Sequence, residues 1–195
     1  MPVIRTCVFA LCAAAAAASW AADLRTPESF ASTSDPAQRS RELFLEASKV
    51  LQHPRCLNCH PNGDRPTQGM DLHPHLPLVV RGKDDKGAVG MRCTACHQAA
   101  NVEPGGFPGN PLWHLAPGSM AWQGKTLAQI CVQIKDKRRN GGKSLPAIQE
   151  HMASDGLVGW AWAPGGTREP APGTQEQLGA LIKAWIDTGA FCPAS

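Results

Sequence analysis

The residues best suited to chemistry are two copies of the pattern Arg-Cys-x-x-Cys-His. They are RCLNCH at 55–60 and RCTACH at 92–97, with matching positions 37 residues apart. Cys-x-x-Cys-His is the attachment signature of c-type haem. Both sulfurs add to vinyl groups at one porphyrin edge, and the adjacent histidine binds the iron. The pattern predicts two covalently bound haem c groups, held by Cys56, Cys59 and His60 and by Cys93, Cys96 and His97.

Two other kinds of site use Cys-x-x-Cys. One is half of a zinc site, and the other is a thioredoxin-like redox pair. Paired zinc motifs need no histidine after each pair, and a thioredoxin-like site needs only one pair in a strand–helix frame. The doubled motif, with a histidine in each copy, therefore favours the two haems.

A sixth iron ligand on each haem would set its reduction potential and decide whether the iron is open to small molecules. His73 and His75 lie on a proline-stiffened loop between the motifs, and a stiff loop can present a ligand at low entropic cost. The other distal candidates are His151, on a short predicted helix beside Met152, and His114 and Met120, in WHLAPGSMAW. The sequence leaves the choice among these five candidates open.

The N-terminus has the composition of a signal peptide. Arg5 is followed by an apolar stretch and then by Ser19-Trp20-Ala21, so we expect cleavage after Ala21 or Ala22. The expected division is a signal peptide at 1–22 and one dihaem cytochrome c domain at 23–195, exported to the periplasm. The sequence has no stretch long and apolar enough for a transmembrane helix.

The composition of the exported part limits its partners and its core. Its formal charge is only +2 once Arg5 is removed, so charge gives no reason to expect nucleic acid as a partner. Cys131 and Cys192 remain outside the motifs, and in an oxidising compartment they most simply form a disulfide. Pro and Gly together make up almost a fifth of the chain, which favours loops over a large apolar core.

Helices are predicted at 36–52, 125–139, 145–154 and 174–189, from apolar spacing and end signals. Asp35-Pro36 starts the first helix, and Gly189 ends the last. Residues 61–90 and 103–119 are predicted to be loops. The expected fold is mainly α with extensive loops, a compact dihaem cytochrome c fold wrapped around two covalent haems, with tryptophans packed against the porphyrins.

Several strings outside the motifs carry a resemblance to a known family. They are HPRCLNCHPNGDRP, the HPH loop, MRCTACH, WHLAP, QIKDKRRNGG, DGLVGWAWAPG and WIDTGAFCP. Over roughly residues 40–193 the chain resembles small bacterial dihaem c-type cytochrome proteins, often labelled as associated with isoquinoline 1-oxidoreductase-type molybdenum hydroxylases. The resemblance implies an electron-accepting cytochrome of the periplasm, with the motif cysteines and histidines as haem ligands. It does not imply that this chain hydroxylates isoquinoline.

Three functions remain open at this point. The first is an electron carrier or electron-transfer subunit without catalysis of its own, which takes electrons from a periplasmic dehydrogenase or hydroxylase and passes them to an acceptor. The second is a haem enzyme with one open iron, either peroxidase-like or reducing a small oxide, because a distal histidine can act as acid or base near neutral pH. A haem-based sensor is the third, although the sequence has no signalling segment.

Overall fold

The computed structural model describes residues 23–194, so the expected signal peptide at 1–22 lies outside the described residues. Its helices are α1 (Pro36–Leu51), α2 (Pro54–Leu57), α3 (Leu127–Lys135), α4 (Leu145–Ser154), α5 (Gly156–Gly159) and α6 (Gln175–Asp187). Two short antiparallel pairs join β1 (Thr67–Gln68) to β2 (His73–Pro74) and β3 (Gly87–Ala88) to β4 (Met91–Arg92). The prediction of a mainly helical chain with long loops is confirmed.

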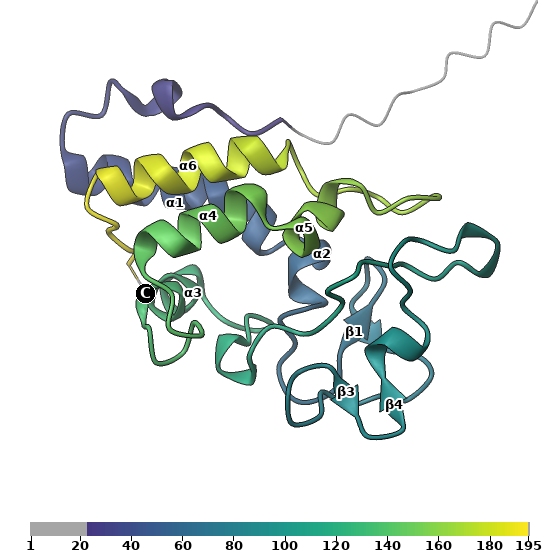
Figure 1. Ribbon diagram of the computed structural model, residues 1–195. Coiled ribbons are helices and arrows are strands. Elements are labelled where there is room, and N and C mark those ends of the chain that lie inside the picture. The colour runs from purple at the N-terminus through teal and green to yellow at the C-terminus, as the bar shows by residue number, and fades with distance from the viewer. Residues whose placement is uncertain (1–22, 195) are drawn as a thin grey trace, which may run out of the picture.

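The chain has two parts of different character. Residues 23–52 and 120–194, here the helical lobe, contain α1, α3, α4, α5 and α6. Residues 61–112, here the loop lobe, contain the four short strands. Figure 1 shows the main helices on one side, the strands on the other, and α2 between them. No helix among the described residues is long and apolar enough to cross a membrane.

The helical lobe is built around α6, which packs against both α1 and α4. Its buried core includes Phe44, Ile130, Leu181 and Trp185, whose side chains are inaccessible to solvent. The Phe44 and Trp185 rings pack with centroids 5.2 Å apart. Burial of side chains of this size stabilises a fold by roughly 2–3 kcal/mol each.

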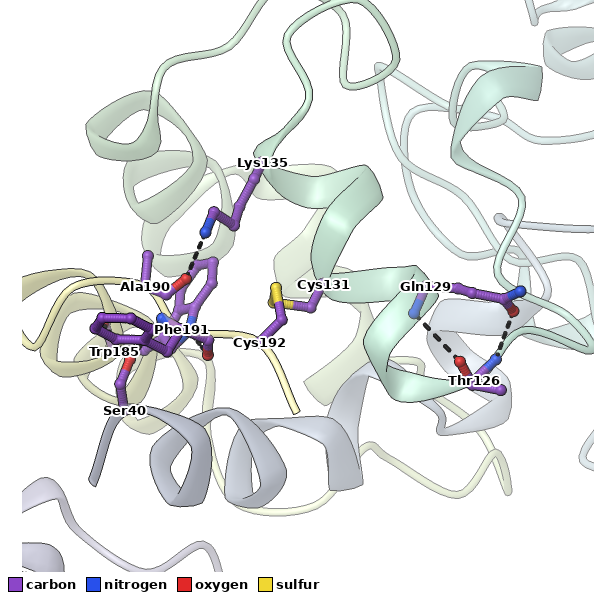
Figure 2. Close-up of a disulfide and its surroundings, with 9 residues drawn as sticks. All are labelled: Ser40, Thr126, Gln129, Cys131, Lys135, Trp185, Ala190, Phe191 and Cys192. Atoms are coloured by element: carbon purple, nitrogen blue, oxygen red, sulfur yellow. Dashed lines mark hydrogen bonds between the residues drawn. A yellow bond between two sulfur atoms is a disulfide. The ribbon is translucent and has the colours of Figure 1, made fainter. Parts of the chain in front are cut away.

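The C-terminal segment is tied back onto this core. Cys131 on α3 and Cys192 after α6 form a disulfide, as predicted. Lys135 donates a hydrogen bond to the Ala190 carbonyl oxygen (2.7 Å), and the Phe191 amide donates to the Ser40 hydroxyl (2.9 Å) (Figure 2). The end of the chain therefore joins α1, α3 and α6.

The predicted helix ends are mostly confirmed. The Asp35 carboxylate caps α1, and Thr174 caps α6 through a capping box. The prediction for α3 was wrong at its end, because the helix stops at Lys135 instead of continuing to 139. The buried Asn140 side chain folds back and donates a hydrogen bond to the Ile134 carbonyl oxygen (2.7 Å). This bond replaces the backbone hydrogen bond that the Ile134 carbonyl oxygen would accept if the helix continued.

Candidate functional site

The first motif begins on α2 and ends in the turn that follows. His53 is the N-cap and Pro54 is the first helical residue, so the helix starts two residues before Cys56. Helical backbone hydrogen bonds continue through the motif, from the Cys59 and His60 amides to the Cys56 carbonyl oxygen (both 3.1 Å). Residues three apart in a helical turn share a face, and both cysteines line the same cavity.

His60 is fixed by two contacts. Its Nδ1 lies 2.7 Å from the Met120 carbonyl oxygen, and its ring is stacked on Trp122 with centroids 3.6 Å apart and planes 9° apart. Because a carbonyl oxygen only accepts hydrogen bonds, Nδ1 carries the proton and Nε2 has a free electron pair. A metal-binding histidine usually donates its other ring N–H to a backbone carbonyl in this way.

The second motif has the same arrangement on different elements. Cys93 begins a 3₁₀ turn, Cys93–Ala95, and His97 follows it. The His97 Nδ1 lies 2.8 Å from the Pro108 carbonyl oxygen, and the ring is stacked on Trp113 with centroids 4.5 Å apart and planes 12° apart. Each motif histidine therefore has a carbonyl partner at Nδ1, a tryptophan against its face, and a free Nε2.

A cavity that is partly open to solvent lies beside the first motif, and its empty space is about 1050 Å³ when the open solvent at its mouth is included. Its apolar wall includes Leu51, Ile148, Met152 and Leu178. The other lining residues that matter here are aromatic or polar: Trp113, Trp122, Trp160, Arg55, Lys143, His114 and His151. A large apolar group with an anionic edge fits such a site, since the walls suit the apolar surface and the cations suit the charge. The residues beside Cys56, Cys59 and His60 thus fit a covalent haem.

The ionisation of the first motif follows from its burial. Burial raises the pKa of the Cys56 thiol to about 12 and that of Cys59 to about 11. Catalytic Cys-x-x-Cys thiols have lowered pKa values, so this pair is unsuited to thioredoxin-like exchange. Burial also lowers the pKa of His60 to about 4, which keeps its ring neutral at physiological pH, as a metal ligand requires.

The two motifs lie close to one another. The nearby Cys93 thiol adds to the rise in the Cys59 pKa, after the larger effect of burial. Trp113, which is stacked on His97, also lines the cavity of the first motif. Its ring meets Trp160 edge to face at 5.0 Å. An aromatic pair therefore lies between the two centres.

The five distal candidates lie in three places: three beside the first motif, one beside the second, and one on the surface. His114, His151 and Met120 line the cavity of the first motif. His151 Nδ1 lies 3.2 Å from an Asp155 carboxylate oxygen, which leaves its Nε2 free. His75 lies next to His97, whereas His73 is paired with Asp71 at 2.6 Å on the surface.

Three charged or polar groups had no sequence signal that singled them out. Arg81 is 7% exposed, and its guanidinium donates to the carbonyl oxygens of Gly63 and Ala116. Lys143 and Asn140 line the cavity. A basic residue inside a long loop and polar residues after a helix are ordinary in sequence. Only the fold buries Arg81 and Asn140 and brings Lys143 to the cavity.

The arginines that precede the two motifs, Arg55 and Arg92, lie in different surroundings. Arg55 lines the cavity, where it lies over the Trp160 ring and donates to the Glu169 carbonyl oxygen. Arg92 instead forms a two-pronged ion pair with Asp84, at 2.7 and 2.6 Å. Arg55 remains available to an anionic edge, and Arg92 already has a carboxylate.

Within residues 23–194, no three His, Cys, Asp or Glu side chains gather as they would around a bare metal ion. The four motif cysteines form no disulfide. Comparison with protein-family models, with curated proteins and with solved structures found no match for this chain.

Proposed function

We propose that this chain is an exported dihaem c-type cytochrome that carries electrons. One observation carries the proposal: both Cys-x-x-Cys-His motifs hold their histidine in the same way. His60 and His97 each have a carbonyl partner at Nδ1, a stacked tryptophan, and a free Nε2. The two motifs lie in different segments of the chain. Metal binding by both rings explains why both histidines have the same three features.

The residues of the chain would divide the work. Cys56 and Cys59 at the first centre, and Cys93 and Cys96 at the second, would form the thioethers. His60 and His97 would bind the irons. When bound, each haem supplies a one-electron couple at its iron. The apolar wall of the cavity would limit the contact of the first haem with water, and Arg55 and Lys143 would balance negative charge at the haem edge.

The short distance between the two centres supports electron transfer from one haem to the other, rather than two haems that act independently. Trp113 contacts His97 and lines the other cavity, so a short protein path joins the two sites. Both cysteines of the first centre are half-buried, whereas Cys96 of the second is exposed. A redox partner, such as a periplasmic dehydrogenase or hydroxylase, would therefore meet the second centre first. The family resemblance of the sequence supports the same reading.

A haem enzyme with one open iron is the second candidate. It is favoured by the His151–Asp155 pair in the first cavity, because a histidine held by a carboxylate can serve as an acid or base. If His151 instead binds the iron, that position is closed. Binding of carbon monoxide to the reduced protein separates the two functions, since only an open or weakly held position accepts it.

The test is haem counting on the full chain, expressed with a cytochrome c maturation system. We expect mass spectrometry to find two covalent haems in the natural protein. The double variants Cys56→Ala/Cys59→Ala and Cys93→Ala/Cys96→Ala should each retain one, and Cys131→Ala/Cys192→Ala, the matched control outside the motifs, should retain two. A natural protein without covalent haem would overturn the proposal.

A further inference from the structure

A second histidine lies against the one from the second motif. The rings of His75 and His97 have centroids 5.9 Å apart and planes 64° apart. His75 follows β2, whereas His97 follows the 3₁₀ turn of the motif, so the contact joins two segments of the loop lobe.

Both rings turn the same nitrogen toward the backbone. His75 Nδ1 lies 3.1 Å from the Pro77 carbonyl oxygen, and His97 Nδ1 lies 2.8 Å from that of Pro108. Each therefore keeps Nε2 free. Two imidazole nitrogens on opposite sides of one metal ion stand about 4 Å apart, because each metal–nitrogen bond is about 2 Å long. Because each ring centroid lies about 1 Å behind its ligating nitrogen, two such rings have centroids about 6 Å apart. The observed centroid separation of 5.9 Å is close to that value.

We propose that His75 is the distal ligand of the second haem, opposite His97. This inference rests on the proposed function, since it requires haem at the second motif. It selects one residue from the five distal candidates and makes the second centre a six-coordinate, bis-histidine site.

The segment that carries His75 is held firmly before any ligand binds. The His75 amide donates to the Pro66 carbonyl oxygen (3.0 Å), and Arg65 donates to the His75 carbonyl oxygen (2.9 Å). Gln68 accepts from the Leu76 amide (3.1 Å), and β1 pairs with β2 just before His75. Little backbone freedom is left to lose on ligation, so binding would cost little entropy.

The other histidines of this region have different positions. His73 is two residues away, but its Nδ1 is paired with the Asp71 carboxylate. His114 Nδ1 donates a hydrogen bond to the Leu112 carbonyl oxygen, and His114 lines the cavity of the first motif. His73 therefore provides a matched control, because it has the same ring and lies only two residues from His75 in the sequence.

The test compares His75→Ala with His73→Ala in the full, haem-loaded protein. Each variant is first checked for two covalent haems and natural helix content. Electron paramagnetic resonance and optical spectra then report the spin state of each haem. In His75→Ala we expect one haem to become high-spin, and the reduced protein to bind one more equivalent of carbon monoxide than the natural protein. Added imidazole should restore the low-spin signal, and His73→Ala should match the natural protein.

If His75→Ala matures poorly, His75→Met supplies a second measurement. Replacing a histidine ligand by methionine raises the potential of a haem, so one of the two potentials should rise, and His73→Met should shift neither. The inference is overturned if His75→Ala keeps its haems in the natural spin states, or if His75→Met leaves both potentials unchanged. Absence of covalent haem from the natural protein would instead remove the proposed function.

Discussion

Arg81 is the only buried cation of the loop lobe, residues 61–112. Its guanidinium pairs with Asp85 at 2.7 Å and donates to the carbonyl oxygens of Gly63 and Ala116. Only 8% of the Arg81 side chain is exposed. If the guanidinium were removed, little water would therefore reach its partners to form hydrogen bonds in its place. Removing one partner of a buried pair leaves the others unsatisfied, at about 3–5 kcal/mol.

The first prediction compares Arg81→Met with Arg92→Met. Both residues pair with an aspartate at 84 or 85, but the Arg92 side chain is 44% exposed. We expect Arg81→Met to lower the free energy of unfolding by about 3 kcal/mol and Arg92→Met to lower it by less than about 1 kcal/mol. Urea denaturation of the haem-loaded proteins measures both. Equal decreases in the free energy of unfolding of the two variants would show that burial does not increase the contribution of Arg81 to stability.

At the scale of residues, the sequence identified the motif side chains but not what fixes them. Cysteine and histidine at a set spacing are visible in the chain. The Nδ1 partners of His60 and His97 are the carbonyl oxygens of Met120 and Pro108, and any residue type supplies a carbonyl. The stacked tryptophans were expected near the haems, but their pairing with individual histidines depends on the fold.

Helix α2 begins with an unusual cap. His53 Nδ1 accepts a hydrogen bond from the Arg55 amide (3.2 Å), which requires this nitrogen to be unprotonated. Burial is the main reason that the pKa of His53 is lowered from its ordinary value, with a nearby Arg55 acting in the same direction and Glu169 in the opposite one. The cap holds the helix that carries Cys56.

The second prediction is that acid weakens this cap. Because the pKa of His53 is lower in the folded than in the unfolded state, its contribution is complete above about pH 6.5 and is lost as the pH falls through the folded-state pKa. An asparagine side chain does not titrate, so it caps a helix at any pH. When the pH falls from 7.5 to 5, the free energy of unfolding should therefore decrease less in His53→Asn than in the natural protein, by up to about 1 kcal/mol. Urea denaturation at both values measures the difference, and identical pH dependence in the two proteins would contradict the prediction.

The disulfide gives a third prediction, for α3 and the C-terminal segment. Cys131 and Cys192 are 61 residues apart, and closing a loop of that length restricts the unfolded chain by about 4 kcal/mol. Cys131→Ala/Cys192→Ala should therefore lower the thermal midpoint markedly. Reductant should lower the midpoint of the natural protein but not that of the variant. A midpoint unaffected by either change would show that the bridge adds no stability.

Helices were predictable where caps and apolar spacing agreed, as for α1, α4 and α6. The early end of α3 was not predictable, because Asn140 acts across six residues on the Ile134 carbonyl oxygen. The loop lobe is ordered by the Arg81 side chain and by backbone hydrogen bonds between distant segments, such as the bond from the Arg81 amide to the Asp64 carbonyl oxygen (2.6 Å). Neither leaves a periodic pattern in the sequence.

The whole molecule is stabilised differently in its two lobes. The helical lobe has a continuous apolar core and a disulfide. Most of the exposed large apolar side chains among the described residues lie instead in the loop lobe, including Leu76 (67%), Leu78 (62%) and Val89 (99%). A covalent haem at the second motif would supply part of the apolar contact that this lobe lacks.

The last prediction follows from this difference and uses hydrogen–deuterium exchange. In Cys93→Ala/Cys96→Ala, faster amide exchange should be confined to residues 61–112, because the core of the helical lobe does not depend on the second motif. In Cys56→Ala/Cys59→Ala, the faster exchange should appear in α4 and α5, whose residues Ile148, Met152 and Leu157 line the emptied cavity. The two variants remove the same chemical groups, so each serves as the control for the other. If both accelerate exchange across the whole chain, the lobes unfold as one unit, and the second haem stabilises the helical lobe as much as its own.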